Sequence, residues 1–154
     1  MFCSNRHEKN ANIPGNLRGT FDGLQLFFDK QKRETLEAAG ELTLDKPYTL
    51  CCEIDADSKR VVCAFSSENL LLNAYRQDHL GMPSMLCIDA SYRLVVEGHT
   101  CFLFGTQGVD HKFHTIFMGV CSSEDTAAHR STYDASVKEV ERLVADRSAR
   151  GVGI

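Results

Sequence analysis

Three apolar, β-rich runs follow one another between residues 85 and 121, and only short turn-prone segments separate them. They cover about residues 85–95, 100–109 and 113–121, and the breaks between them read VEGH and DHK. Runs of this length with such breaks favour antiparallel strands joined by tight turns. The sequence therefore predicts a three-stranded meander. The second and third runs are apolar at successive positions, so we expect helices on both faces of this sheet.

A helix is predicted directly after the meander. The stretch SSED at 122–125 is typical of a helix start, where carboxylates lie near the positive end of the helix dipole. We expect the helix to end near Arg147. Its predicted inward stripe, with spacings of four, three and four, consists of Tyr133, Val137, Val140 and Val144.

The first half of the chain has a weaker pattern. Residues 1–20 are polar and aperiodic, which predicts a loose tail. A helix is expected over 21–40, and the runs YTLCCEID and RVVCAFSS, joined by ADSK, predict a hairpin over 48–65. Ser66 or Ser67 then caps a further helix. The predicted inward residues of that helix are Leu70, Leu71, Ala74 and Tyr75.

The composition limits the class of protein. A length of 154 residues suits one domain, and 17 basic against 21 acidic residues give a net charge of −4, without the basic surplus typical of nucleic-acid binders. No apolar run reaches the ~18 residues of a membrane helix, so no membrane partner is expected. Seven cysteines, an odd number, without a secretory leader predict reduced intracellular thiols. They are Cys3, Cys51, Cys52, Cys63, Cys87, Cys101 and Cys121.

Asp89 is the unexpected residue of the first predicted strand. It follows Leu86, Cys87 and Ile88, where the pattern asks for a buried side chain. A carboxylate in the middle of a central strand is costly unless a metal or another partner satisfies it. A second interpretation makes Asp89 an edge-facing or hydrogen-bonded residue that holds no metal.

Several motifs around Asp89 occur in an order that resembles a known family. They are Asp-Ala-Ser-Tyr-Arg at 89–93, Gly-Val-Asp-His at 108–111, Phe-His at 113–114 and Ser-Glu-Asp-Thr at 123–126. Residues 60–146 as a whole resemble the opening of the MULE (Mutator-like element) transposase domain, the catalytic domain of a group of cut-and-paste DNA transposases.

The resemblance implies a truncated ribonuclease-H-like fold of the α/β (α+β) class, in which a three-stranded antiparallel meander is followed by a helix. Residues 83–154 would form the partial transposase domain. Residues 21–82 would form an N-terminal extension made of a helix, a hairpin and a helix, preceded by the tail at 1–20.

The resemblance also implies a chemistry. In this family two aspartates and a glutamate hold two Mg²⁺ (or Mn²⁺) ions that promote phosphoryl transfer on DNA. Asp89 matches the first aspartate, which makes it the candidate catalytic and metal-binding residue. If Asp89 lies opposite Gly105, then Asp110 is roughly 16 Å away at about 3.3 Å per residue, too far to share a cation. Asp146 falls on the last turn of a helix. We therefore expect the second aspartate and the glutamate to lie beyond residue 154.

The expected function is that of a fragment or derivative of a Mutator-like DNA transposase that is inactive alone. Its implied partners are DNA and either a second copy or another transposase chain, and its implied location is the nucleus. The alternative is a non-catalytic interaction or regulatory protein that retains half of the fold.

Other sites stay open as minor hypotheses. A thiol nucleophile is conceivable at Cys51-Cys52, although nothing places a base beside it. Basic clusters that can meet phosphate occur at Lys30, Lys32 and Arg33 and at Arg6, His7 and Lys9. A zinc site without the usual ligand spacing would draw on Cys87, His99, Cys101, His111, His114 and Cys121.

Overall fold

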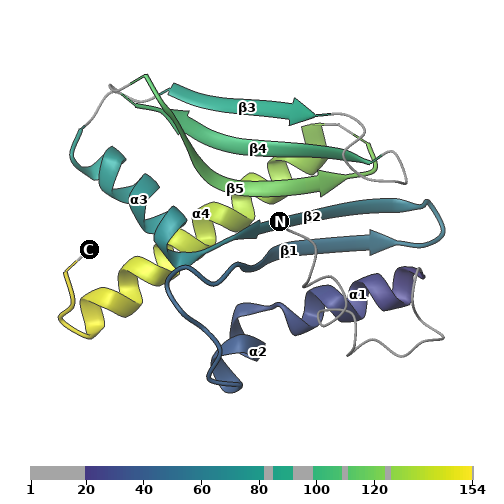
Figure 1. Cartoon of the computed structure of the whole chain (residues 1–154), viewed down its shortest axis with the longest axis horizontal. Coiled ribbons are helices and arrows are strands. Elements are labelled where there is room, and N and C mark those ends of the chain that lie inside the picture. Colours follow the sequence, from purple (N-terminus) through teal and green to yellow (C-terminus); the bar gives the residue numbers. More distant parts are fainter. Residues whose placement is uncertain (1–19, 82–84, 92–98, 109–110, 124–125, 154) are drawn as a thin grey trace, which may run out of the picture.

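The computed structural model describes residues 20–81, 85–91, 99–108, 111–123 and 126–153 (Figure 1). Within these residues the chain forms one five-stranded antiparallel sheet, with the strand order β1-β2-β5-β4-β3, and four helices. The predicted mixed α+β class is confirmed. In chain order the elements are α1 (Phe21–Lys30), α2 (Arg33–Ala38), β1 (Tyr48–Asp55), β2 (Arg60–Ser66), α3 (Glu68–His79), β3 (Met85–Ser91), β4 (Thr100–Gln107), β5 (Phe113–Cys121) and α4 (Thr126–Ala149).

Strand β2 connects the predicted hairpin to the predicted meander. It pairs antiparallel with β5, and Val62 lies opposite Cys121. At the other end of the seam the buried Ser66 hydroxyl donates a hydrogen bond to the Ile116 carbonyl at 2.5 Å. Strands from both halves of the chain therefore belong to one sheet.

The hairpin forms as predicted, because its turn residues suit the geometry. The Asp55 carboxylate accepts hydrogen bonds from the backbone N–H groups of Asp57 and Ser58 at 3.0 and 3.4 Å. Lys59 then adopts a left-handed conformation with φ 54°. An aspartate that bonds to the backbone two and three residues later is a common way to stabilise such a turn.

The helix expected over 21–40 is instead two helices, α1 and α2. Lys32 is extended and forms an isolated parallel bridge with Thr49 of β1, and the Thr49 N–H donates to the Gln31 carbonyl at 2.8 Å. The backbone at Gln31 and Lys32 is thus engaged by the sheet and does not continue the helix. A contact between distant parts of the chain overrides the local helical pattern.

Ser67, one of the two residues proposed as the cap, is the N-cap of helix α3. The Ser67 hydroxyl accepts a hydrogen bond from the Leu70 N–H at 3.4 Å, whereas Ser66 is used in the β2–β5 seam. Leu71 and Leu72 are buried, but Leu70 is 36% exposed. The predicted inward position of Leu70 is therefore wrong.

Helix α4 packs on the sheet through small residues. Tyr133 and Val137 of the predicted stripe are 41% and 37% exposed, so this prediction is wrong for both. Strand β4 already fills the interface with aromatic rings, since Phe102 packs edge-on against the His129 ring of α4 at 5.1 Å. Small side chains on the helix permit this close approach. The buried residues of α4 are Ala128, Thr132, Ser136 and Leu143.

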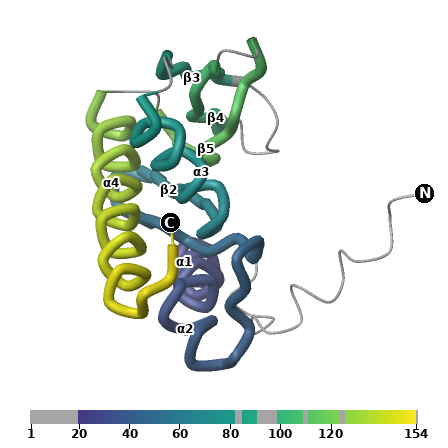
Figure 2. Tube along the Cα trace, turned by 90° about the vertical axis from the view of Figure 1, so that its left-hand side faces the viewer, coloured from purple at the N-terminus to yellow at the C-terminus, as the bar shows by residue number. Residues whose placement is uncertain are grey.

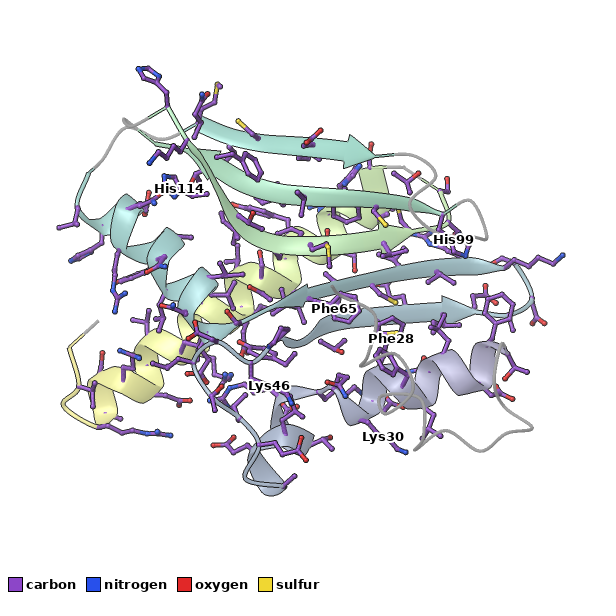
Figure 3. The ribbon with its side chains drawn as sticks, viewed as in Figure 1. Phe28, Lys30, Lys46, Phe65, His99 and His114 are labelled. Atoms are coloured by element: carbon purple, nitrogen blue, oxygen red, sulfur yellow. The ribbon has the colours of Figure 1, made fainter. Side chains whose placement is uncertain are left out.

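The two faces of the sheet are covered unequally (Figures 1 and 2). Helix α4 runs along one face, and Figure 2 shows it standing beside the sheet. Helix α1 packs on the opposite face over β1 and β2, where Phe28 contacts Phe65 at 5.1 Å between ring centroids (Figure 3). Next to Phe65 across the seam, Met118 of β5 is 46% exposed. Helical cover of both faces is thus observed over β1 and β2, and it does not extend to Met118.

Replacing Gly119 with Ala tests the packing of the seam. A Cβ at Gly119 would overlap the ring of Phe102, which is 1% exposed and held against Phe117 and His129. Overpacking of this kind costs about 1–3 kcal/mol of unfolding free energy. Urea unfolding measures the loss. The control is Gly153→Ala, where the added Cβ meets no atom within 4 Å and stability should not change. Equal stability of the two variants would contradict the packing described here.

Candidate functional site

The structure places Asp89 on an edge strand. Strand β3 is the last strand of the sheet, and the Asp89 side chain is exposed. The expectation of a buried carboxylate in a central strand is therefore wrong, because the β2–β5 seam extends the sheet on the side away from β3. An exposed carboxylate keeps its hydration and needs no metal to offset burial.

The register of β3 also differs from the prediction. Asp89 lies opposite Leu103, and it is Cys87 that lies opposite Gly105. Leu103 in turn pairs with Met118, so the side chains that follow Asp89 across this face are apolar. Asp89 thus borders a hydrophobic surface in the described part of the sheet.

Two other acids were weighed above as partners of Asp89 and were not expected to join it. Asp110 lies outside the described residues. Asp146 is on α4 and accepts a hydrogen bond from Arg142 at 2.7 Å. Among the residues that the structure describes, no group of three or more His, Cys, Asp or Glu side chains could hold a metal ion.

Neither metal hypothesis therefore has a complete ligand set in the described residues. Mg²⁺ bound through one exposed carboxylate keeps most of its waters, so Asp89 does not fit a two-cation centre by itself. The cysteines and histidines proposed for zinc likewise form no such cluster within the described ranges.

A hollow lies elsewhere in the described part of the chain, beside β1. It has a volume of about 700 Å³ and is lined by residues of α2, β1 and α4. Arg33 lines this hollow with a side chain that is 10% exposed, and its guanidinium lies 2.8 Å from a carboxylate oxygen of Glu68 and 3.7 Å from one of Glu139. The Tyr48 hydroxyl donates to Glu139 at 2.8 Å. Burial, with Glu139 next in importance, raises the pKa of Tyr48, so the phenol stays protonated and remains a donor.

This cluster serves to join elements. Arg33 comes from α2, Tyr48 from β1, Glu68 from α3 and Glu139 from α4. The Arg33 guanidinium is engaged by the carboxylates of Glu37 and Glu68, so it is not a surface contact for phosphate. Sequence reasoning placed Arg33 in a basic cluster and missed the network, because its partners are up to about a hundred residues away along the chain.

The structure describes part of the basic clusters proposed for phosphate, and its helices bear on the expected absence of a membrane partner. Lys32 forms an ion pair with Asp29 at 2.7 Å. The basic residues proposed in the tail, Arg6, His7 and Lys9, lie outside the described residues. Among the described helices, none has the length and apolar character required to cross a membrane.

A pair of thiols occupies the hairpin. Cys52 of β1 lies directly opposite Cys63 of β2, and the two Sγ atoms are 3.3 Å apart. The six described cysteines are all thiols. The sequence pattern indicated Cys52 together with its neighbour Cys51, and it did not indicate Cys63. The sequence contained the information needed to find Cys63, because a hairpin with its turn at residues 56–59 places Cys52 opposite Cys63.

Replacing Arg33 with Met tests whether the charge cluster holds the elements together. The substitution leaves the carboxylate of Glu68, which is 13% exposed, without the guanidinium that lies 2.8 Å from it, whereas Glu139 keeps its closer ion pair with Arg142. Breaking a buried pair in this way costs about 3–5 kcal/mol. Lys46→Met is the control, because Lys46 and Glu41 form a more exposed pair at 3.6 Å and such pairs contribute little. Thermal unfolding of both variants measures the difference. An Arg33→Met protein as stable as the Lys46→Met protein would refute a structural role for the cluster.

Comparison of the chain with protein-family models, with curated proteins and with solved structures finds no match. The likeness to Mutator-like transposases thus depends on the motifs quoted above and stays a prediction. The described part of the chain is a mixed α+β structure whose strands form one antiparallel sheet, with Asp89 on its edge strand β3.

Proposed function

We propose that this chain derives from a Mutator-like DNA transposase and acts by pairing with another chain at β3, without carrying out phosphoryl transfer alone. The proposed fold is a partial ribonuclease-H-like one. The observation that carries the proposed pairing and inactivity is the position of Asp89, an exposed carboxylate on the last strand of the described sheet, with apolar cross-strand neighbours.

The order of elements supports the ancestry. The motif Asp-Ala-Ser-Tyr-Arg begins on β3, which is followed by β4, β5 and the 24-residue helix α4. An antiparallel meander and then a helix is the order that the family resemblance predicts. On this proposal the DNA partner and the nuclear location follow from ancestry, and Mg²⁺ or Mn²⁺ would require carboxylates in addition to Asp89.

The chemistry of Asp89 supports inactivity of the chain by itself. Two-metal phosphoryl transfer needs several carboxylates that converge on ions about 4 Å apart. The described neighbours of Asp89 across the sheet are Leu103 and then Met118. Neither side chain binds a hard cation, since such ions prefer oxygen ligands.

The edge strand supports a binding role. Beyond β3 the sheet has no further strand among the described residues, so within that part of the chain one side of its backbone has no strand partner. Met85, Leu86 and Ile88 of this strand are 61%, 57% and 47% exposed. An edge with large apolar side chains is a template for another strand. A second copy of this chain and a longer transposase chain are the partners that the proposal names.

The first experiment tests catalysis. Purified chain is incubated with double-stranded and single-stranded DNA in the presence of Mg²⁺ or Mn²⁺, and products are resolved on denaturing gels. We expect no cleavage or joining, and no change in melting temperature with either cation, because one exposed carboxylate binds them weakly.

The controls for this experiment are Asp89→Asn and Asp57→Asn, the latter an exposed aspartate in the β1–β2 turn. Metal-dependent cleavage that Asp89→Asn abolishes and Asp57→Asn retains would overturn the proposal of inactivity. The coding sequence downstream of residue 154 tests the ancestry separately. A further apolar strand that bears an aspartate there would support it.

The second experiment tests pairing at β3. We expect sedimentation to show reversible association that grows with concentration and that Ile88→Lys prevents, because a lysine on an edge strand opposes strand addition. Leu80→Lys is the matched control, since Leu80 is 72% exposed but follows α3. A wild-type chain that stays monomeric at its solubility limit would argue against self-pairing. Association that both variants retain would assign it to another surface.

A second candidate function follows from the same edge. A partner chain that adds a strand to β3 would bring its own side chains next to Asp89, and an active centre would then be shared between two chains. The catalytic assay repeated with a full-length relative of the transposase class distinguishes the two functions. Cleavage that depends on Asp89 of this chain would favour the shared centre.

A further inference from the structure

We propose that Cys52 and Cys63 form a reversible oxidation site, at which a hydroperoxide converts two thiols into a disulfide that links β1 to β2. The inference is independent of the transposase proposal, because it concerns the opposite end of the sheet. It rests on the placement of the two sulfur atoms, their unequal access to solvent and the charges around them.

The hairpin brings the two thiols together. Cys52 and Cys63 are direct partners in the β1–β2 register, and their Sγ atoms are 3.3 Å apart. A disulfide has an S–S distance of about 2.0 Å, so the two sulfur atoms must move closer together to bond. The turn at Asp55 and the pairing of Val62 with β5 hold both strands in this register.

The two thiols differ in access. Cys63 is fully buried against α1, in the same cluster as Phe28 and Val61. Cys52 is partly buried and lines both the 700 Å³ hollow and a second one of about 410 Å³ farther along β1. A small oxidant can therefore reach Cys52 first, and Cys63 is placed to react in a second step.

The surroundings favour a thiolate at Cys52. A hydrogen bond from Cys63 is the main cause that lowers the pKa of Cys52, and the ammonium of Lys32 lowers it further, while burial, Asp29 and Glu53 act in the opposite direction. The same hydrogen bond raises the pKa of Cys63, which keeps its proton. Burial raises the pKa of the adjacent Cys51 to about 12, so this neighbour is an inert thiol.

The reaction balances with one hydroperoxide. The Cys52 thiolate attacks the terminal peroxide oxygen, an S–O bond forms, the O–O bond breaks, and the departing alkoxide or hydroxide takes up a proton. Cys52 is then a neutral sulfenic acid, so the charge that favoured the proton on Cys63 is gone. Cys63 loses its proton and attacks the Cys52 sulfur, and the expelled hydroxide becomes water. Two thiols and one hydroperoxide give a disulfide, an alcohol or water, and one water.

The product should be reducible. Residues directly opposite each other on antiparallel strands have Cβ atoms about 4.5–5.5 Å apart, wider than most disulfides prefer. A thiolate of a dithiol reductant can reach the Cys52 sulfur through the same hollows that admit the oxidant. Oxidation would thus fix the β1–β2 hairpin for as long as oxidising conditions last.

The test treats the folded, reduced full-length chain with hydrogen peroxide and follows it by intact mass and by peptide mapping. We expect the loss of two hydrogen atoms, a Cys52–Cys63 linked peptide pair and full recovery with dithiothreitol. Circular dichroism before and after oxidation verifies that the fold is retained. Sulfonic acids on several cysteines, without that peptide pair in folded protein, would overturn the proposal.

Variants assign the roles of the two thiols. Cys52→Ser should stop the reaction. Cys63→Ser, whose hydroxyl can still donate a hydrogen bond to Cys52 but cannot form a disulfide, should arrest it at a Cys52 sulfenic acid that a dimedone probe captures. Cys51→Ser is the matched control and should oxidise like the wild type. If Cys63→Ser does not fold, alkylation of the wild type at neutral pH still tests the proposal, because it must modify Cys52 before Cys51 and Cys63. Equal labelling of Cys51 and Cys52, or a loss of oxidation in Cys51→Ser, would refute the assignment.

Discussion

The pairing of β2 with β5 is the contact on which the arrangement of this chain depends. It runs through Val62, Cys63, Ala64 and Phe65 on one strand and joins segments more than fifty residues apart. The buried hydroxyl of Ser66 and the absence of a side chain at Gly119 belong to the same seam, since the ring of Phe102 lies where a Cβ would be. This pairing joins the hairpin to the meander, so β1 and β3 are the two edges of the described sheet. Cys52 on β1 and Asp89 on β3 therefore lie at opposite ends of it.

The two edges differ in how they are covered. At β1, the bridge between Lys32 and Thr49 occupies part of the backbone, and the Arg33 cluster ties α2, α3 and α4 to the same strand. At β3, the described part of the chain provides no such cover, and large apolar side chains meet solvent. Proteins commonly protect edges against unwanted pairing. In the described part of the chain, the edge at β1 is thus covered by backbone and charge contacts, and the opposite edge at β3 is the one to which the proposed partner would add.

Local patterns in the sequence were sufficient for most of the strands. The turn residues around Asp55 and the three apolar runs after residue 85 identify the hairpin and the meander, because both depend on neighbours along the chain. The division of the first helix at Lys32, the buried face of α4 and the edge position of Asp89 depend on contacts between distant segments, which periodicity does not encode. In α4, for example, the polar residues Thr132 and Ser136 would be assigned to the solvent side from the sequence alone. They are buried because the aromatic rings of β4 and β5 leave room only for small side chains there. For the candidate site, the sequence located Asp89 on a strand but missed its register by two residues.

The open backbone of β3 has a thermodynamic consequence. A partner that binds the folded chain there, and does not bind the unfolded chain, adds a stabilising free energy that grows with the logarithm of the partner's concentration. Resistance to heat would then depend on how much partner is in solution, so a dilute preparation and a crowded compartment would report different midpoints for the same polypeptide.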